Sequence, residues 1–304
     1  MNDPAHEARR QRLIGIGLMC GAVALFAALD AIAKYLGGYL DTLQVVSLRF
    51  ISAFVIALIF FNPITKPDLV KTKRLGLQVV RGLMLVSTTI CNFMAFRYLQ
   101  LDEALAILFA TPFLVAALAG PVLGEWVGWR RWTAIAVGFA GVLVIIRPGM
   151  SGGMQWAAIF SVAAAIFYAC YGIATRMVSR SDPSDTTLFY GNLVAVVAMG
   201  PLLPFVWGGP LTWFDIGLIV AMGTLGSVSH YLLIAAHRRA PASVLSPFIY
   251  TQIVWAIALG YLVFANMPTR WTLIGSAIVV ASGLYLIHRE RKVTGRVVAP
   301  VEPG

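Results

Sequence analysis

Residues 13–35 read LIGIGLMCGAVALFAALDAIAKY, an apolar run that carries only two charged residues, Asp30 and Lys34. A helix needs roughly 20 mostly apolar residues to cross the hydrocarbon core of a bilayer, so this run is long enough for one span. Three arginines precede it, as in a signal peptide, but no small-residue cleavage site follows a short apolar core. We therefore interpret the run as a retained transmembrane helix.

Nine further apolar runs follow the first, and together they indicate the class of the protein. The chain has 304 residues, of which 59% are hydrophobic and 12% are charged, and its mean hydropathy is +0.82. Soluble domains carry about 25% charged residues, so this composition excludes an ordinary soluble protein. We predict an all-α integral membrane protein with ten transmembrane helices, in residues 13–35, 43–62, 76–96, 104–123, 132–146, 155–175, 186–206, 215–236, 242–264 and 271–288.

The basic residues indicate the orientation of these spans, because cytoplasmic loops of membrane proteins are enriched in Lys and Arg. With the N-terminus in the cytoplasm, 17 of the 23 Lys and Arg fall on the cytoplasmic side. The opposite side receives four, which are Lys34, Arg97, Arg147 and Arg270. We therefore expect both termini in the cytoplasm, and we attribute the net charge of +10 to this asymmetry rather than to nucleic-acid binding.

The two halves of the chain align with each other at an offset of about 141 residues. Phe26 aligns with Tyr168, Gly82 with Gly223, and the segment at Ala95 with the one at Ala236. Each half holds five spans, and because five is odd, the second half must lie in the membrane with the opposite orientation.

These observations predict four segments: a cytoplasmic tail at 1–12, a five-helix repeat at 13–147, an inverted five-helix repeat at 154–288, and a cytoplasmic tail at 289–304. Inverted repeats are the architecture of many secondary transporters, which hold their substrate near the membrane midplane between the repeats. We therefore expect a transporter that works by alternating access. A duplication that built only a membrane scaffold is the alternative.

Several motifs resemble those of the EamA family of the drug/metabolite transporter superfamily. They are Gly124-Glu125-Trp126, Gly138-Phe139-Ala140-Gly141-Val142-Leu143 before Arg147-Pro148-Gly149, and Ser246-Pro247-Phe248-Ile249-Tyr250-Thr251-Gln252. The likeness extends from about residue 13 to 290. One departure is visible, because the glutamate at Glu125 often recurs in the second repeat of the family, whereas the matching residue here is Asn266.

The resemblance implies a multi-pass carrier of small metabolites in the bacterial inner membrane. Activities known in the family include export of amino acids, with aromatic amino-acid exporters of the YddG type among them, and uptake of riboflavin or S-adenosylmethionine. We expect an exporter of amino acids, and uptake of a vitamin or nucleoside-like metabolite is the alternative. The lipid bilayer, a small-molecule substrate and protons are the expected partners, and the chain is a monomer or a homodimer.

Charged groups within spans are costly unless they are paired or hydrated, so each is a candidate for substrate binding or coupling. Asp30 is the one acidic residue that we expect within a span. Lys34 lies four residues later on the same helical face, so the alternative to a binding role is an Asp30–Lys34 ion pair. For Arg49, in the second span, we weigh binding of Asp30 or of a substrate carboxylate against a structural role.

Further candidates are polar or aromatic side chains expected in mid-span. An aromatic wall that stacks on a planar substrate would comprise Phe26, Tyr168, Tyr171, Tyr190 and Trp255, and helix packing is its alternative. Asn92, His230 and Gln252 would add hydrogen bonds or carry a coupling proton. Pro112 and Pro247 are expected to interrupt the fourth and ninth spans, where a gate would bend.

The sequence offers little support for catalysis. The chain has no HExxH or GxxxxGK(S/T) motif and no aspartate cluster for a metal-bound diphosphate, and we expect neither an enzyme nor a cofactor. A membrane-embedded enzyme or scaffold remains the alternative class. Cys20, Cys91 and Cys170 lack the close spacing of a metal site, and we expect no metal.

Overall fold

The computed structural model describes residues 4–60, 63, 66–124, 129–147, 156–178, 181–240, 245 and 248–297, and every regular element among them is a helix. Six helical segments are long and apolar enough to cross a membrane; they are Arg9–Leu36, Thr42–Ile59, Leu75–Tyr98, Ala158–Val178, Asp185–Phe205 and Trp213–Leu233. Trp132–Ile146 and Gln252–Phe264 are shorter apolar helices. The structure therefore confirms a multi-span helical membrane protein.

The helices of the first half are α1 (Pro4–Leu36), α2 (Thr42–Phe60), the short 3-10 helix η1 (Pro67–Val70), α3 (Leu75–Tyr98), α4 (Leu101–Leu108), α5 (Thr111–Leu123) and α6 (Trp129–Ile146). Those of the second half are α7 (Ala158–Val178), α8 (Ser184–Met199), the 3-10 helix η2 (Gly200–Phe205), α9 (Trp213–Arg239), α11 (Gln252–Phe264) and α12 (Arg270–Val297). The sequence run 104–123 is thus two helices, separated by a turn at Phe109 and Ala110.

Pro112 lies in the first turn of α5, immediately after this break. Proline has no backbone N–H to donate, and the first turn of a helix is where that loss costs least. The expected interruption of the fourth span is therefore present at the start of a new helix. Pro247, the expected counterpart in the ninth span, and Glu125 of the family motif lie outside the described residues.

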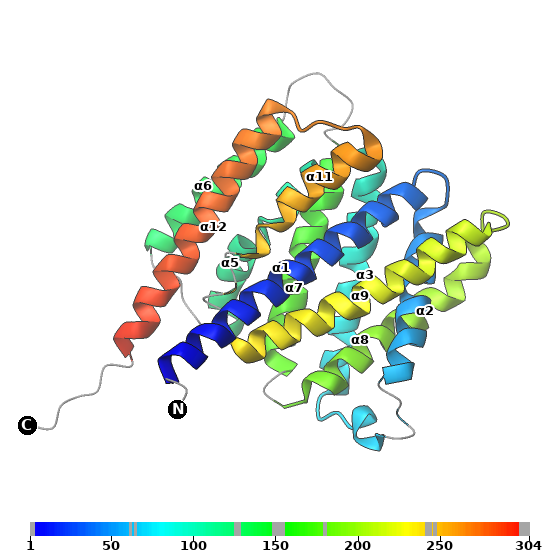
Figure 1. Ribbon diagram of the computed structural model, residues 1–304, viewed down its shortest axis with the longest axis horizontal. Helices are drawn as coiled ribbons and strands as arrows, with labels where there is room; N and C mark the ends of the chain where they lie inside the picture. Colours follow the sequence, from blue (N-terminus) through cyan, green and yellow to red (C-terminus); the bar gives the residue numbers. More distant parts are fainter. Residues whose placement is uncertain are drawn as a thin grey trace, which may run out of the picture.

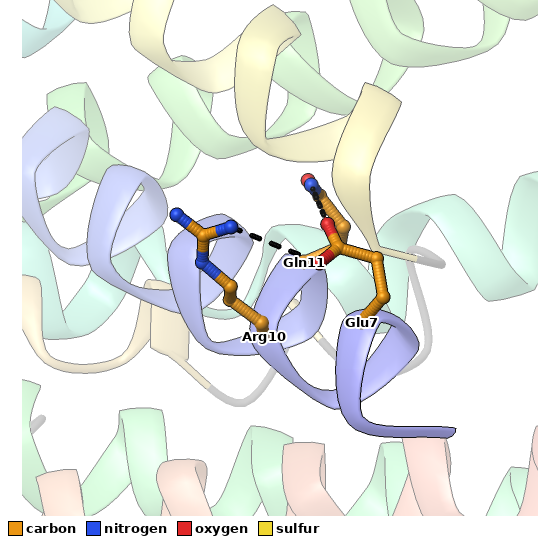
Figure 2. Close-up of polar contacts among 3 residues, drawn as sticks. All are labelled: Glu7, Arg10 and Gln11. Carbon is orange, nitrogen blue, oxygen red and sulfur yellow. Dashed lines mark hydrogen bonds and ion pairs between the residues drawn. The ribbon is translucent and has the colours of Figure 1, made fainter. Parts of the chain in front are cut away.

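Helix α1 begins ahead of its apolar run, so the described part of the expected N-terminal tail is helical. Figure 2 shows its first turns, where Gln11 Nε2 donates to Glu7 Oε1 at 2.8 Å and Arg10 lies 3.7 Å from Glu7 Oε2. These i,i+3 and i,i+4 contacts stabilise a solvated helix start. The first turn of α1 and the last turn of α12 lie at the same end of the molecule (Figure 1).

The helices of the two halves pack in corresponding pairs. Helix α1 packs along α9, and its counterpart α7 packs along α3 (Figure 1). In the same way α2 contacts α9 and α8 contacts α3, while α6 packs along α12. Exchanging the halves therefore maps these principal contacts onto one another.

The contact between α6 and α12 depends on glycine. A Cβ atom added to Gly275 would lie 2.6 Å from the backbone oxygen of Gly141 and would also collide with Ile145. The two backbones approach more closely than any side chain allows, as is common between membrane helices.

Hydrogen bonds also join the halves at the end that carries the α2–α3 and α7–α8 connections, which we call the inner end after the orientation predicted above. Asp182, between α7 and α8, accepts hydrogen bonds from Thr72 Oγ1, from the Lys73 amide at 3.1 Å and from Gln78 Nε2 at 2.9 Å. Burial acts to raise the pKa of Asp182, but these hydrogen bonds outweigh it and hold the pKa below its ordinary value.

Arg81 continues this inner network into the helices. The side chain is 2% exposed, and its donors reach Gln78 Oε1 at 3.4 Å, Tyr171 Oη at 3.0 Å and the backbone oxygen of Thr187. Its guanidinium carbon also lies 5.1 Å from the centre of the Tyr171 ring. Arg81 thus links α3 to α7 and α8, and its donors face protein acceptors.

We expect Gly275→Ala to lower the melting temperature in detergent, because overpacking a close helix contact costs about 1–3 kcal/mol. The matched control is Gly217→Ala on α9, where an added Cβ would meet nothing within 4 Å. A glycine replaced by alanine in a helix at an open position is neutral or stabilising. Thermal unfolding followed by gel filtration measures both. A Gly275→Ala protein as stable as Gly217→Ala would contradict the close contact.

Asp182→Asn should lower the melting temperature at neutral pH, because the carboxylate that accepts three hydrogen bonds is lost. A carboxyl whose pKa is lowered by folding stabilises the fold above its unfolded pKa of about 3.9. That contribution begins to fall below about pH 4 and is lost once the pH is below the folded value, so the difference from the wild type should shrink as the pH is lowered through this range. Exposed Asp68, bonded to Lys71, provides the control variant Asp68→Asn. A difference that is constant with pH would refute the account.

Candidate functional site

The candidate site lies where α1, α2, α7, α9 and α11 approach one another. Asp30 on α1 is 7% exposed, and its Oδ2 accepts a hydrogen bond from Gln252 Nε2 on α11 at 3.3 Å. Arg49 on α2 interacts electrostatically with Asp30, although no direct ion pair or hydrogen bond joins them in the described structure. The carboxylate and the guanidinium thus both come from the first half, and the second half contributes the amide of Gln252.

The Arg49 guanidinium has unused hydrogen-bonding capacity. Its Nε and Nη1 are buried, and neither has a hydrogen-bond partner among the described residues. The guanidinium carbon lies 4.8 Å from the Phe50 ring centre and 5.7 Å from that of Phe93, so cation–π contacts hold it in place. Buried polar groups without partners are rare and costly, about 1–3 kcal/mol or more for a charged group. This geometry suits an acceptor supplied by a ligand.

Aromatic side chains surround this charged pair. The ring of Phe26 contacts the ring of His230 edge-on, with centroids 5.0 Å apart. His230 on α9 interacts electrostatically with Arg49, and Tyr168 on α7 interacts electrostatically with Asp30. The rings of Tyr168 and Tyr171 stack, with centroids 5.8 Å apart and planes 12° from parallel.

The structure therefore brings together seven of the residues expected from the sequence; they are Phe26, Asp30, Arg49, Tyr168, Tyr171, His230 and Gln252. Tyr168 is 44% exposed. Asn92 lies on α3 next to Phe93, and its Oδ1 is buried with no hydrogen-bond partner among the residues that the structure describes.

Other expected residues lie elsewhere. Tyr190 donates from its hydroxyl to the backbone oxygen of Val70 in η1 at 2.8 Å, so it belongs to the inner end and not to an aromatic wall with Phe26. Trp255 is 45% exposed on α11, and no contact of its side chain with the residues above is found in the described structure.

Lys34 does not pair with Asp30, contrary to the alternative that the sequence spacing left open. Its ammonium donates to the backbone oxygens of Phe96 and Leu99, at 2.7 and 2.5 Å. These carbonyls lie at the C-terminal end of α3, where helical hydrogen bonding leaves acceptors free and a cation is favoured. Asp30 is therefore left to Arg49 and Gln252.

Two buried acidic residues were missed from the sequence. Asp102 is 2% exposed and Glu103 is 5% exposed, both in the first turn of α4. The fourth span was expected to begin at 104, which placed both residues before it, whereas α4 begins at Leu101 and buries both. The glutamate three residues after Gln100 was the available signal, since such spacing is typical of a helix start.

No group of three or more His, Cys, Asp or Glu side chains in the described ranges is arranged to hold a metal ion. The side chains brought together at the candidate site are charged, amide and aromatic groups.

Comparison with known proteins agrees with this reading of the fold. The S-adenosylmethionine uptake transporter of Rickettsia conorii is 27% identical over 291 residues, which are 96% of this chain and 98% of the relative. The riboflavin transporter of Vibrio cholerae is 25% identical over 285 residues, which are 91% of this chain and 94% of the relative.

A solved crystal structure is similar in fold, with a TM-score of 0.64 and 15% identity, over 92% of this chain and 98% of that one. The model of the EamA-like transporter family matches the chain twice, over residues 13–147 and 155–288. The two matches together cover most of the chain, and we conclude that this protein belongs to the EamA-like transporter family.

Proposed function

We propose that this protein is a secondary transporter of small metabolites that carry an amino-acid group and a planar ring, with S-adenosylmethionine as the first substrate to test. The observation that carries the proposal is that Arg49 Nε and Nη1 are buried without a hydrogen-bond partner among the described residues, within electrostatic reach of the Asp30 carboxylate. The ammonium and carboxylate of an amino-acid group complement such a pair, because a guanidinium binds a carboxylate through two parallel hydrogen bonds.

The aromatic residues support the second part of the proposal. Tyr168 and Tyr171 offer a stacked pair of rings, Tyr168 within electrostatic reach of Asp30, and Phe26 offers a third ring one turn before Asp30 on α1. A planar base or side chain gains about 0.5–1.5 kcal/mol from such a contact beyond its area burial. The amino-acid portion would fix the orientation of the substrate, and the ring would distinguish it from other amino acids.

Alternating access between inverted repeats is part of the same proposal. The corresponding helix pairs and the two family matches support a pseudo-two-fold relation between the halves. The candidate residues come from both halves, so rocking one half against the other would expose the charged pair first to one side of the bacterial inner membrane and then to the other. The transporter would carry its substrate inward or outward according to the gradients.

Export of amino acids, including aromatic ones, is the narrower candidate, because phenylalanine or tryptophan would satisfy the same charged pair. Uptake of riboflavin is the other candidate, supported by the similarity to a riboflavin transporter. Riboflavin has no amino-acid group, so it would leave Arg49 and Asp30 without the partners described above.

Arg49→Gln and Asp30→Asn should each raise the KM for S-adenosylmethionine at least about tenfold in proteoliposomes. Truncating one partner of a buried, hydrogen-bonded charge pair costs about 2–5 kcal/mol, and each 1.4 kcal/mol is tenfold. Uptake of labelled S-adenosylmethionine and labelled phenylalanine gives the measurement, with unlabelled riboflavin as competitor. The matched control is Arg270→Gln, which removes an exposed arginine at the start of α12.

Three outcomes decide between the candidates. Saturable S-adenosylmethionine flux that both variants weaken and Arg270→Gln spares would support the proposal. Phenylalanine flux without S-adenosylmethionine flux would move the function to amino-acid transport through the same pair. Transport of riboflavin, with both variants as active as the wild type, would overturn the role of Asp30 and Arg49.

A further inference from the structure

A second group of buried charges lies at the opposite end from Asp182, which we call the outer end and which carries the α3–α4 and α11–α12 connections. It comprises Lys34 of α1 with Asp102 and Glu103 of α4, and Lys34 interacts electrostatically with both carboxylates. Nothing in the substrate site described above uses Asp102 or Glu103.

The hydrogen bonds at the outer end are unequally distributed between the two carboxylates. Both carboxylate oxygens of Glu103 accept a hydrogen bond, one from Thr272 Oγ1 of α12 at 3.3 Å and one from the backbone N–H of Gln100 at 3.4 Å. Asp102 Oδ2 is buried, and no donor reaches it from any described residue. Ser276, one turn after Thr272 on the same face of α12, is also buried, with its hydroxyl unpartnered in the described structure.

The charges of the group do not balance. The group has two carboxylates and one ammonium. Lys34 donates its short hydrogen bonds to the Phe96 and Leu99 carbonyls and not to either carboxylate. A buried charge without a partner costs several kcal/mol, and one bound proton would remove the excess. Asp102 is the carboxylate with an oxygen free to take it.

We next consider the other charged groups on the helices that pack against α4, because a further cation beside Asp102 would balance its charge. Arg97 of α3 and Arg270 of α12 are exposed, and Arg147 follows the end of α6. Arg176 lies in the last turn of α7, at the inner end, and the residues of α11 include no charged side chain. Lys34 is the cation whose charge is found to act on Asp102 among the described residues.

We propose that Asp102 is the proton-binding group that couples a proton gradient to transport. The inference rests on the proposed transport function, but it does not depend on which substrate is carried. A proton from one side of the membrane adds to Asp102 Oδ2 and leaves from the same oxygen on the other side. One O–H bond forms and the same bond later breaks, with no other chemical change.

The position of the group explains how this proton would act on the substrate site. Lys34 is one helical turn from Asp30 on α1, and Glu103 is hydrogen-bonded to Thr272 of the opposite half. Adding the proton takes the net charge of the three groups from −1 to 0. The contact between α4 and the helices of the second half is then stabilised at the outer end, so the outward-facing and inward-facing states respond differently to pH.

The first test uses proteoliposomes clamped at zero membrane potential. A carrier that couples one proton to one substrate can accumulate substrate about tenfold across one pH unit. We expect Asp102→Asn to lose this accumulation while it keeps substrate exchange in the absence of a pH gradient. Exposed Asp68→Asn is the matched control and should accumulate like the wild type. An Asp102→Asn protein that still accumulates substrate under the pH gradient would overturn the proposal, as would accumulation driven by sodium alone.

The second test needs no substrate and so separates this inference from the proposed function. Infrared difference spectra of the protein in nanodiscs, recorded between acidic and alkaline pH, should contain a carboxylic-acid band that Asp102→Asn lacks and Asp68→Asn retains. Should Asp102→Asn fail to fold, Asp102→Glu should keep a titrating band at a shifted pH. An unchanged spectrum in the folded Asp102 variant would refute proton binding there, even if every transport assay of the substrate succeeded.

Discussion

In a mostly apolar protein, a buried charged group finds few hydrogen-bond partners, and this constraint decides the roles of the charged side chains. Arg49 is held by two aromatic rings and by the field of Asp30, but two of its donors face no acceptor among the described residues. Buried Arg81 shows the contrast, because its donors are met by Gln78, Tyr171 and Thr187. Arg81 therefore links the helices around it, whereas our proposal assigns substrate binding to Arg49.

The same constraint acts on the two ends of the molecule. At the inner end, Asp182 gathers donors from the first half and holds α3 to the α7–α8 connection. At the outer end, Tyr39 donates to Asp215 at 2.6 Å and Thr272 donates to Glu103, so polar contacts between the halves occur there as well. In the alternating-access mechanism that we propose, the polar contacts at one end break while those at the other end remain. Hydrogen bonds at helix ends can break in this way without exposing the apolar side chains between the helices.

Much of the fold could be predicted from the sequence, because the bilayer imposes a length and an apolar composition on every span. The constant offset between the halves predicted corresponding helices, and Asp30, Arg49 and His230 were found from their charge or polarity inside apolar runs. What the sequence could not provide was the partner of each group. The spacing of Asp30 and Lys34 predicted a shared helical face, yet the ammonium reaches carbonyls of α3, which no pattern reveals.

Tyr190 and Asp102 were misplaced for related reasons. Tyr190 falls within an apolar run, but η1 contacts α8, and the Tyr190 hydroxyl donates a hydrogen bond to the backbone oxygen of Val70 in η1. Asp102 and Glu103 seemed to precede the fourth span because carboxylates lower its hydropathy, whereas the helix begins at Leu101 and buries both. Hydropathy locates the apolar centre of a span well and its polar ends poorly.

The claim on which the account depends is that Arg49 receives the carboxylate of the substrate. The direct measurement is the binding of S-adenosylmethionine and of its decarboxylated analogue to the purified wild-type protein and to Arg49→Gln, which gives four affinities in one thermodynamic cycle. The account predicts that loss of the carboxylate weakens binding strongly in the wild type and hardly at all in the variant. An equal loss in both proteins would show that the carboxylate is bound elsewhere and would contradict the account.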